Sequence, residues 1–192
     1  MKQRKKHLLF TLLLIFLTTV FIGCSQLKGN EESGKDFDKY LDDMFKTEVQ
    51  KDSLTLNYSL AHPENYGITD PKVTLGHYSV DYLKDLLVSY ENYLARLEKF
   101  NYGSLSDSQK LTYDILKEDL SLEKEMGDLI LYNEILGPTT GIQAQLPVLL
   151  AEFNFYGKGD IETYLALLPK IQDYFNEIIE FEKEKSAAGL FM

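Results

Sequence analysis

The side chain with the most specific chemical surroundings is the thiol of Cys24, the only cysteine in this chain of 192 residues. It follows Gly23 directly, at the end of a run from Leu8 to Ile22 in which only threonines interrupt the apolar side chains. Secreted proteins that use cysteines for disulfides normally carry several, in pairs. A single cysteine at the end of an apolar run instead indicates covalent modification of that thiol.

The segment before Cys24 has the composition of a bacterial export signal. Four basic residues between Lys2 and Lys6 precede the apolar run. That run is shorter than the roughly 20 apolar residues that a membrane-spanning helix needs. The sequence Phe21-Ile22-Gly23-Cys24 resembles the bacterial lipobox, whose commonest form is Leu-Ala-Gly-Cys. We therefore expect a lipoprotein signal peptide over residues 1–23 and acyl chains, such as palmitate, on Cys24. The alternative is an uncleaved signal anchor.

Charge and lipid together predict how the protein meets a membrane. Each buried methylene contributes about 0.8 kcal/mol, so two or three acyl chains would anchor the protein to the cell membrane, on its extracytoplasmic side. Four of the 20 basic residues and none of the 30 acidic residues precede Cys24, so the rest of the chain is more acidic than the net charge of −10 for the whole sequence. An acidic surface repels nucleic acid and anionic headgroups. We expect no nucleic-acid partner, and attachment through the lipid alone.

The remaining residues form no catalytic or metal-binding motif. His7 belongs to the signal segment, His62 precedes a proline and His77 precedes a tyrosine, so none begins a His-Glu-x-x-His zinc motif. The sequence has no phosphate-binding loop, dinucleotide fingerprint or Gly-x-Ser-x-Gly elbow. Acidic residues alternating with lysines on helices favour a solvated face. A hydrolase built from scattered Asp and Glu is the least favoured alternative.

Two stretches are candidates for ligand contact. Uncharged polar residues interrupt the apolar pattern at Gly141, Gln143 and Gln145, which predicts a ligand groove, although a structural turn explains them equally well. Tyrosines recur from Tyr82 to Tyr93 at helical spacing, where core packing is favoured over a ligand wall.

These residues must be positioned by helices. Residues 24–35 are polar and aperiodic, which predicts a flexible tether. A helix follows, with Asp36 as its N-cap and an apolar stripe up to Val49. Residues 53–60 alternate as a strand would, but no second strand candidate follows, so we expect a helix that Ser53 could cap.

Two long amphipathic helices come next, and they predict an antiparallel hairpin. The first begins at Ser79 and ends near Phe100. The second begins with a capping box formed by Ser106 and Gln109 and continues to about Tyr132. The first apolar residues of its stripe are Leu111, Ile115 and Leu122.

The C-terminal part predicts a short buried helix over residues 146–155, with Pro147 in its first turn, and a last helix capped by Asp160. Pro169 should kink that helix, and Gly189 is a candidate C-cap. Lys183 and Lys185 suit the negative end of its macrodipole. The predicted fold is an all-α domain of antiparallel amphipathic helices over residues 36–192.

Five segments, in a fixed order, are similar to the start of the bacterial family labelled domain of unknown function 885. They cover most of the chain after the tether: Phe37-Asp38-x-x-Leu41-Asp42-Asp43-x-Phe45, Leu56-x-Tyr58-x-Leu60-x-x-Pro63-Glu64-x-Tyr66-Gly67-Ile68, Leu111-Thr112-Tyr113-Asp114-Ile115-Leu116, Gln143-x-Gln145-Leu146-Pro147-x-Leu149-Leu150-Ala151-Glu152, and Asp160-x-x-x-Tyr164-Leu165-x-x-Leu168-Pro169.

The resemblance implies a large helical protein like a zinc metallopeptidase, often exported and often lipidated. The family's proposed metal centre is a His-Glu-x-x-Pro-Gly-His stretch far downstream, and this chain contains no His-Glu pair. No catalytic or zinc-binding residue therefore carries over. Zinc and a peptide substrate are expected only in a full-length member.

Two hypotheses follow. In the first, the chain is the front part of such a protein, its apolar faces pack on further elements, and the isolated fragment self-associates. In the second, it is a stand-alone lipid-anchored helical module that binds a ligand or partner at the cell envelope.

Overall fold

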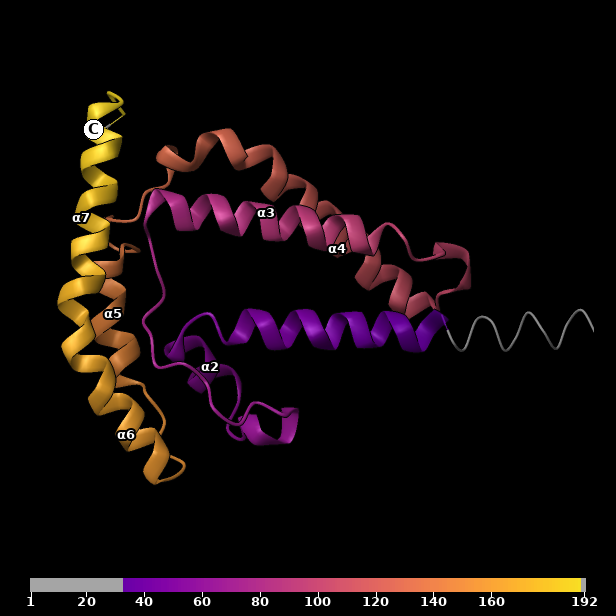
Figure 1. Ribbon diagram of the computed structural model, residues 1–192, viewed down its shortest axis with the longest axis horizontal. Coiled ribbons are helices and arrows are strands. Elements are labelled where there is room, and N and C mark those ends of the chain that lie inside the picture. The colour runs from indigo at the N-terminus through magenta and orange to yellow at the C-terminus, as the bar shows by residue number, and fades with distance from the viewer. Residues whose placement is uncertain (1–32, 191–192) are drawn as a thin grey trace, which may run out of the picture.

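A computed structural model describes residues 33–190, which form an all-α fold (Figure 1). These residues contain helices, short 3₁₀ turns and connecting segments, and no strand, so the predicted fold class is confirmed. The predicted signal peptide over residues 1–23, Cys24 and the tether up to residue 32 lie outside the described residues. The first described helix covers residues 33–49. It thus includes residues 33–35, which the sequence assigned to the tether, and Asp36 lies within it and is not its N-cap.

Six further α-helices follow, joined by 3₁₀ turns at Pro63–Tyr66 (η1), Tyr102–Ser104 (η2), Met126–Tyr132 (η3) and Leu168–Lys170 (η4). The helices are α2 (Ser53–Ser59), α3 (Val80–Leu97), α4 (Asp107–Glu125), α5 (Ile142–Ala151), α6 (Lys158–Leu167) and α7 (Ile171–Ala187).

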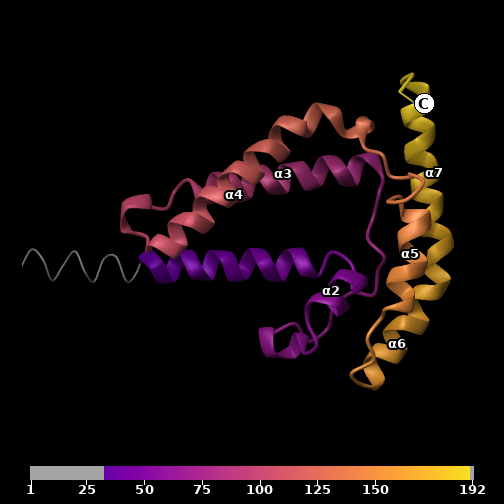
Figure 2. The same ribbon diagram turned by 180° about the vertical axis from the view of Figure 1, so that it is seen from behind.

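One group of helices, which we call the hairpin arm, comprises the helix over residues 33–49 together with α3 and α4 (Figures 1 and 2). α3 and α4 run antiparallel and pack on each other, which confirms the predicted hairpin. The side chain of Ser106 accepts from the Gln109 N–H, and the Gln109 side chain accepts from the Ser106 N–H, so the capping box is also confirmed. Phe37, Tyr40, Leu97, Leu105, Tyr113 and Leu120 form the buried cluster of this arm.

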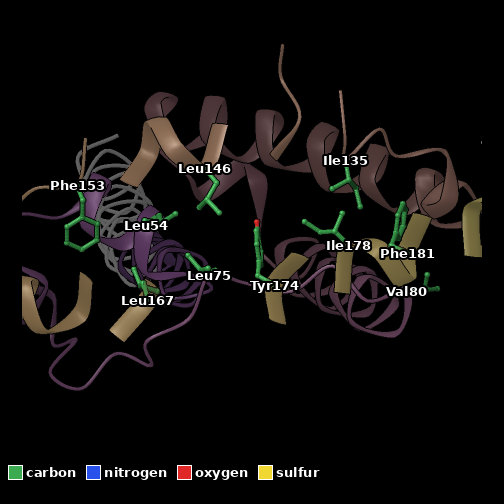
Figure 3. Close-up of a cluster of buried hydrophobic side chains, with 10 residues drawn as sticks. All are labelled: Leu54, Leu75, Val80, Ile135, Leu146, Phe153, Leu167, Tyr174, Ile178 and Phe181. Atoms are coloured by element: carbon green, nitrogen blue, oxygen red, sulfur yellow. The ribbon is translucent and has the colours of Figure 1, made fainter. Parts of the chain in front are cut away.

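The second group, the C-terminal arm, comprises α5, α6 and α7 and lies across the end of the hairpin arm (Figures 1 and 2). Its cluster of buried side chains also takes in residues from the N-terminal half of the chain, notably Leu54, Leu75 and Val80. Figure 3 shows Tyr174 in the middle of this cluster, with Leu75 and Leu146 on one side and Ile178 on the other. The core therefore joins segments that are distant in sequence.

The helix expected near residues 53–60 is confirmed as α2, but its N-cap is Asp52 and not Ser53. The Asp52 carboxylate accepts from the Thr55 N–H at 2.8 Å. Ser53 is buried and holds the connection between α2 and α3 instead, because its N–H donates to the Thr74 carbonyl at 2.8 Å. The buried Asn57 side chain adds a pair of 2.8 Å hydrogen bonds to the backbone of Asn154.

The apolar residues of α4 lie on two faces of the helix, of which only one is buried. Tyr113 and Leu120 are buried, whereas Leu111, Ile115 and Leu122 are exposed. The α-helix also ends at Glu125, earlier than predicted, and η3 continues the chain to Tyr132 through a kink.

The short helix of the C-terminal arm begins earlier than predicted. α5 starts at Ile142 after the N-cap residue Gly141, so Pro147 lies inside the helix and not in its first turn. Only Leu146 of this helix is buried, whereas Val148 and Leu149 are exposed, because a helix that packs along one side leaves the other to solvent.

The start of α6 brings one further correction, and the end of α7 agrees with the prediction. Asp160 is not an N-cap residue but lies in the first turn of α6, where its carboxylate accepts from the N–H groups of Tyr156 and Gly157. Lys185 lies in the last turn of α7, as predicted, and its side chain is only 3% exposed. Pro169 does interrupt the helix, within η4. Gly189 has a φ of 75° and ends α7, as predicted.

Candidate functional site

The structure gives the predicted groove residues local backbone partners. Gly141 precedes α5, and its surroundings leave no room for a side chain. The side-chain amide of Gln143 donates to the Gly137 carbonyl, and that of Gln145 lies 3.5 Å from the Thr139 carbonyl. These contacts close the turn before α5. The proposed ligand groove at these three residues stays a prediction, and the other candidate residue, Cys24, lies outside the described residues.

One concave site lies where the two arms meet, and we call it the tyrosine cleft. It has a volume of 430 Å³ and is lined by α2, the connection before α3, and α3, α5 and α7. Apolar residues of its lining, including Leu54, Leu75 and Leu146, belong to the core cluster seen in Figure 3. Its polar lining includes four tyrosines and three charged or titratable side chains: Tyr58, Tyr78, Tyr82, Tyr174, Lys51, Asp52 and His77.

On one wall, His77 forms a pair with Glu177 of α7. The His77 Nδ1 atom lies 3.0 Å from Glu177 Oε1, and the Tyr78 N–H donates to Glu177 Oε2 at 3.0 Å. Burial alone would raise the pKa of Glu177, but the contacts with His77 and the Tyr78 N–H outweigh it and lower that pKa. The His77 ring also lies against Tyr82, with 5.3 Å between ring centroids. This pair therefore fixes the connection onto α7.

Two tyrosines of the cleft, Tyr82 and Tyr174, have a raised pKa and stay protonated at neutral pH. Burial is the main cause that raises the pKa of both Tyr174 and Tyr82, and the carboxylate of Asp52 adds to both shifts. The Tyr174 ring meets the Tyr78 ring edge-on at 5.6 Å. Tyr58 is different, because its side chain is 73% exposed at the mouth of the cleft. The cleft thus presents the neutral phenols of Tyr82 and Tyr174 on the same lining as the Asp52 carboxylate.

A second hollow, which we call the α4 groove, lies on the hairpin arm. It has a volume of 440 Å³ and is almost entirely apolar. Glu48 is its one charged lining residue, and the groove is otherwise formed by Leu41, Met44, Phe45, Thr112, Ile115 and Leu116.

Neither hollow supplies a metal site. Within residues 33–190, no group of three or more His, Cys, Asp or Glu side chains is placed to hold a metal ion. His62 contacts Glu64, and His77 contacts Glu177, so each histidine has only one carboxylate partner. No described helix is long and apolar enough to cross a membrane.

Compared with known protein families, curated proteins and solved structures, the chain shows no match.

Sequence reasoning missed the tyrosine cleft because its residues come from five separate segments. It favoured core packing for the tyrosines of α3, and this describes Tyr90 and Tyr93, which pack on the core of the hairpin arm. Tyr82, one turn from the N-terminus of α3, lines the cleft instead. The only sequence signal was the high frequency of tyrosine, 13 residues with no tryptophan.

Proposed function

We propose that this chain is a lipid-anchored protein on the extracytoplasmic face of a bacterial cell membrane, and that its helices form the N-terminal segment of a larger protein like a zinc peptidase. The observation that carries the second part is the apolar face of α4. The side chains of Leu111, Ile115 and Leu122 are 63%, 60% and 55% exposed although they lie on a regular amphipathic helix.

A face of this kind is typical of a helix that packs on a further element. The α4 groove lies beside it, and Phe45 and Ile115 line that groove while remaining exposed. In the proposed larger protein, residues beyond this chain would cover both. The zinc ion and the peptide substrate would belong to that remaining part, and the described helices would serve as a scaffold near the membrane.

The genomic reading frame tests the second part of the proposal. DNA after the codon for Met192 should continue, in frame or after one frameshift, to a sequence encoding His-Glu-x-x-Pro-Gly-His. A stop codon followed by unrelated sequence would contradict it.

Lipid attachment is tested by expressing the full chain in a bacterium supplied with a labelled fatty acid. The wild-type chain and a Ser25→Ala control should both take up the label and partition into detergent. The Cys24→Ala variant should do neither. Labelling of Cys24→Ala at the wild-type level would refute the lipid anchor.

The second candidate function is a stand-alone binding module, and the tyrosine cleft favours it. A 430 Å³ hollow with apolar walls and a few polar groups has the size and composition of small-molecule sites. This candidate predicts a monodisperse protein with one cooperative unfolding transition. The larger-protein proposal predicts concentration-dependent self-association through α4, and sedimentation velocity in detergent separates the two outcomes.

A further inference from the structure

The tyrosine cleft contains one charge without an ionic partner. Lys51 pairs with Glu48, and His77 pairs with Glu177, so the two basic groups of the lining each meet a carboxylate. Among the described residues, Asp52 forms no ion pair, and one of its oxygens accepts only the Thr55 N–H. A ligand in the cleft would therefore meet an uncompensated negative charge.

Aromatic side chains line the same hollow as this carboxylate. Tyr58 comes from α2, Tyr82 from α3 and Tyr174 from α7, and all three line the same hollow as Asp52. The face of a tyrosine ring attracts a cation within about 6 Å of its centre, and sites for quaternary ammonium groups commonly combine several rings. The phenols of Tyr82 and Tyr174 are neutral, so they add no competing charge.

We propose that the tyrosine cleft binds an organic ammonium group, held by the Asp52 carboxylate and by the tyrosine rings. This inference names the ligand class of the binding-module proposal and rests on it. Neutral apolar ligands would use the rings but not the carboxylate. Anions would be repelled by the Asp52 carboxylate, and they would find no free basic partner in the lining because Lys51 and His77 already pair with carboxylates.

The probe is choline chloride, compared with its neutral isostere 3,3-dimethylbutan-1-ol. The full chain is held in maltoside micelles, and binding is measured by ligand-observed NMR at constant ionic strength. The positive charge should give choline at least about tenfold higher affinity than the isostere. Equal affinities would show a cleft that binds ligands without selecting cations, which overturns the inference and leaves the binding module standing. If neither probe binds, the inference is also overturned, while the binding module is decided by its own test of monodispersity and cooperative unfolding.

Asp52→Asn is the first variant, because asparagine caps a helix as well as aspartate does and removes only the charge. It should weaken choline binding at least about fivefold and leave the isostere unaffected. Asp81→Asn is the control, since Asp81 also lies at the start of a helix and does not line the cleft. Unchanged choline affinity in Asp52→Asn would overturn the inference.

Tyr58 gives a second test that does not depend on the helix cap. Its side chain is 73% exposed, so replacing it should not disturb the core. Tyr58→Leu should weaken choline binding by about two- to fivefold, whereas Tyr58→Phe, which keeps the ring, should change it less than twofold. Equal effects of the two substitutions would refute the contribution of the ring.

Discussion

Lys185 should stabilise the fold mainly through its buried hydrocarbon and much less through its charge. Its ammonium group lies 2.6 Å from the Glu134 carboxylate and 3.0 Å from the Asn133 carbonyl, which fixes α7 to the segment after η3. The side chain of Lys185 is only 3% exposed, whereas that of Glu134 is 61% exposed. Water therefore screens the ion pair from one side, although the lysine itself has been desolvated.

The Lys185→Ala substitution removes three methylenes, worth about 2.4 kcal/mol of burial, together with the charged hydrogen bonds. We expect a total loss of about 3 to 4 kcal/mol in the free energy of unfolding. Lys185→Met keeps nearly the same volume and removes the cost of burying a charge, so it should stay within about 1 kcal/mol of the wild type.

Urea denaturation followed by circular dichroism at 222 nm measures both variants. Glu134→Gln serves as the control for the ion pair, and it should lose about 1 kcal/mol or less, with the loss shrinking at high salt. Two results would refute the reasoning. The first is equal destabilisation by Lys185→Ala and Lys185→Met, and the second is a Glu134→Gln loss as large as that of Lys185→Ala.

Three further predictions concern single positions. Gly141→Ala should lower the unfolding free energy by about 1 to 3 kcal/mol, because its Cβ would collide with backbone atoms, whereas Gly157→Ala, at another N-cap but with open space around it, should lose at most about 0.5 kcal/mol in the same urea titration. Burial raises the pKa of Tyr40 to about 12, and its hydroxyl donates to the Tyr93 carbonyl. The contribution of this hydroxyl to the free energy of unfolding is therefore complete below about pH 10, the ordinary pKa of tyrosine, and is lost as the pH rises through about 12. Tyr40→Phe should cost about 1 kcal/mol at pH 7 and flatten this alkaline decline in stability; an unchanged decline would contradict the assignment. Ser106→Ala should cost about 1 kcal/mol through loss of the capping box, and a thermal melt that does not shift would argue against it.

Local chemistry determined what the sequence could predict correctly. The capping box at Ser106, the interruption at Pro169 and the cap at Gly189 each depend on residues within one or two turns, so their side-chain types were sufficient. The all-α class followed similarly, from helical spacing of apolar residues and the lack of paired strand candidates.

Burial could not be predicted in the same way, because it depends on what packs against each face. α4 carries apolar residues around much of its circumference, and only contact with the rest of the hairpin arm separates the buried Leu120 from the exposed Leu122. The position of Lys185 at the end of the last helix was predicted, but its burial was not, because the packing of α7 encloses it. The tyrosine cleft has no sequence pattern of its own, since Asp52 and Tyr174 meet only in the folded chain.

The contacts that close the cleft also determine when the fold can be completed during synthesis. α3 and α4 are neighbours in sequence and can pair as soon as both have left the ribosome. Asn57 must wait for Asn154, 97 residues later, and His77 must wait for Glu177, 100 residues later. α2 lacks its partner until Asn154 has been made, and the connection after α2 lacks its partner until α7 has been made, so their apolar side chains remain open to association with other chains in the meantime. α2 and the connection after it, which line the cleft, are thus synthesised early but gain their long-range hydrogen bonds only when the C-terminal arm has been made.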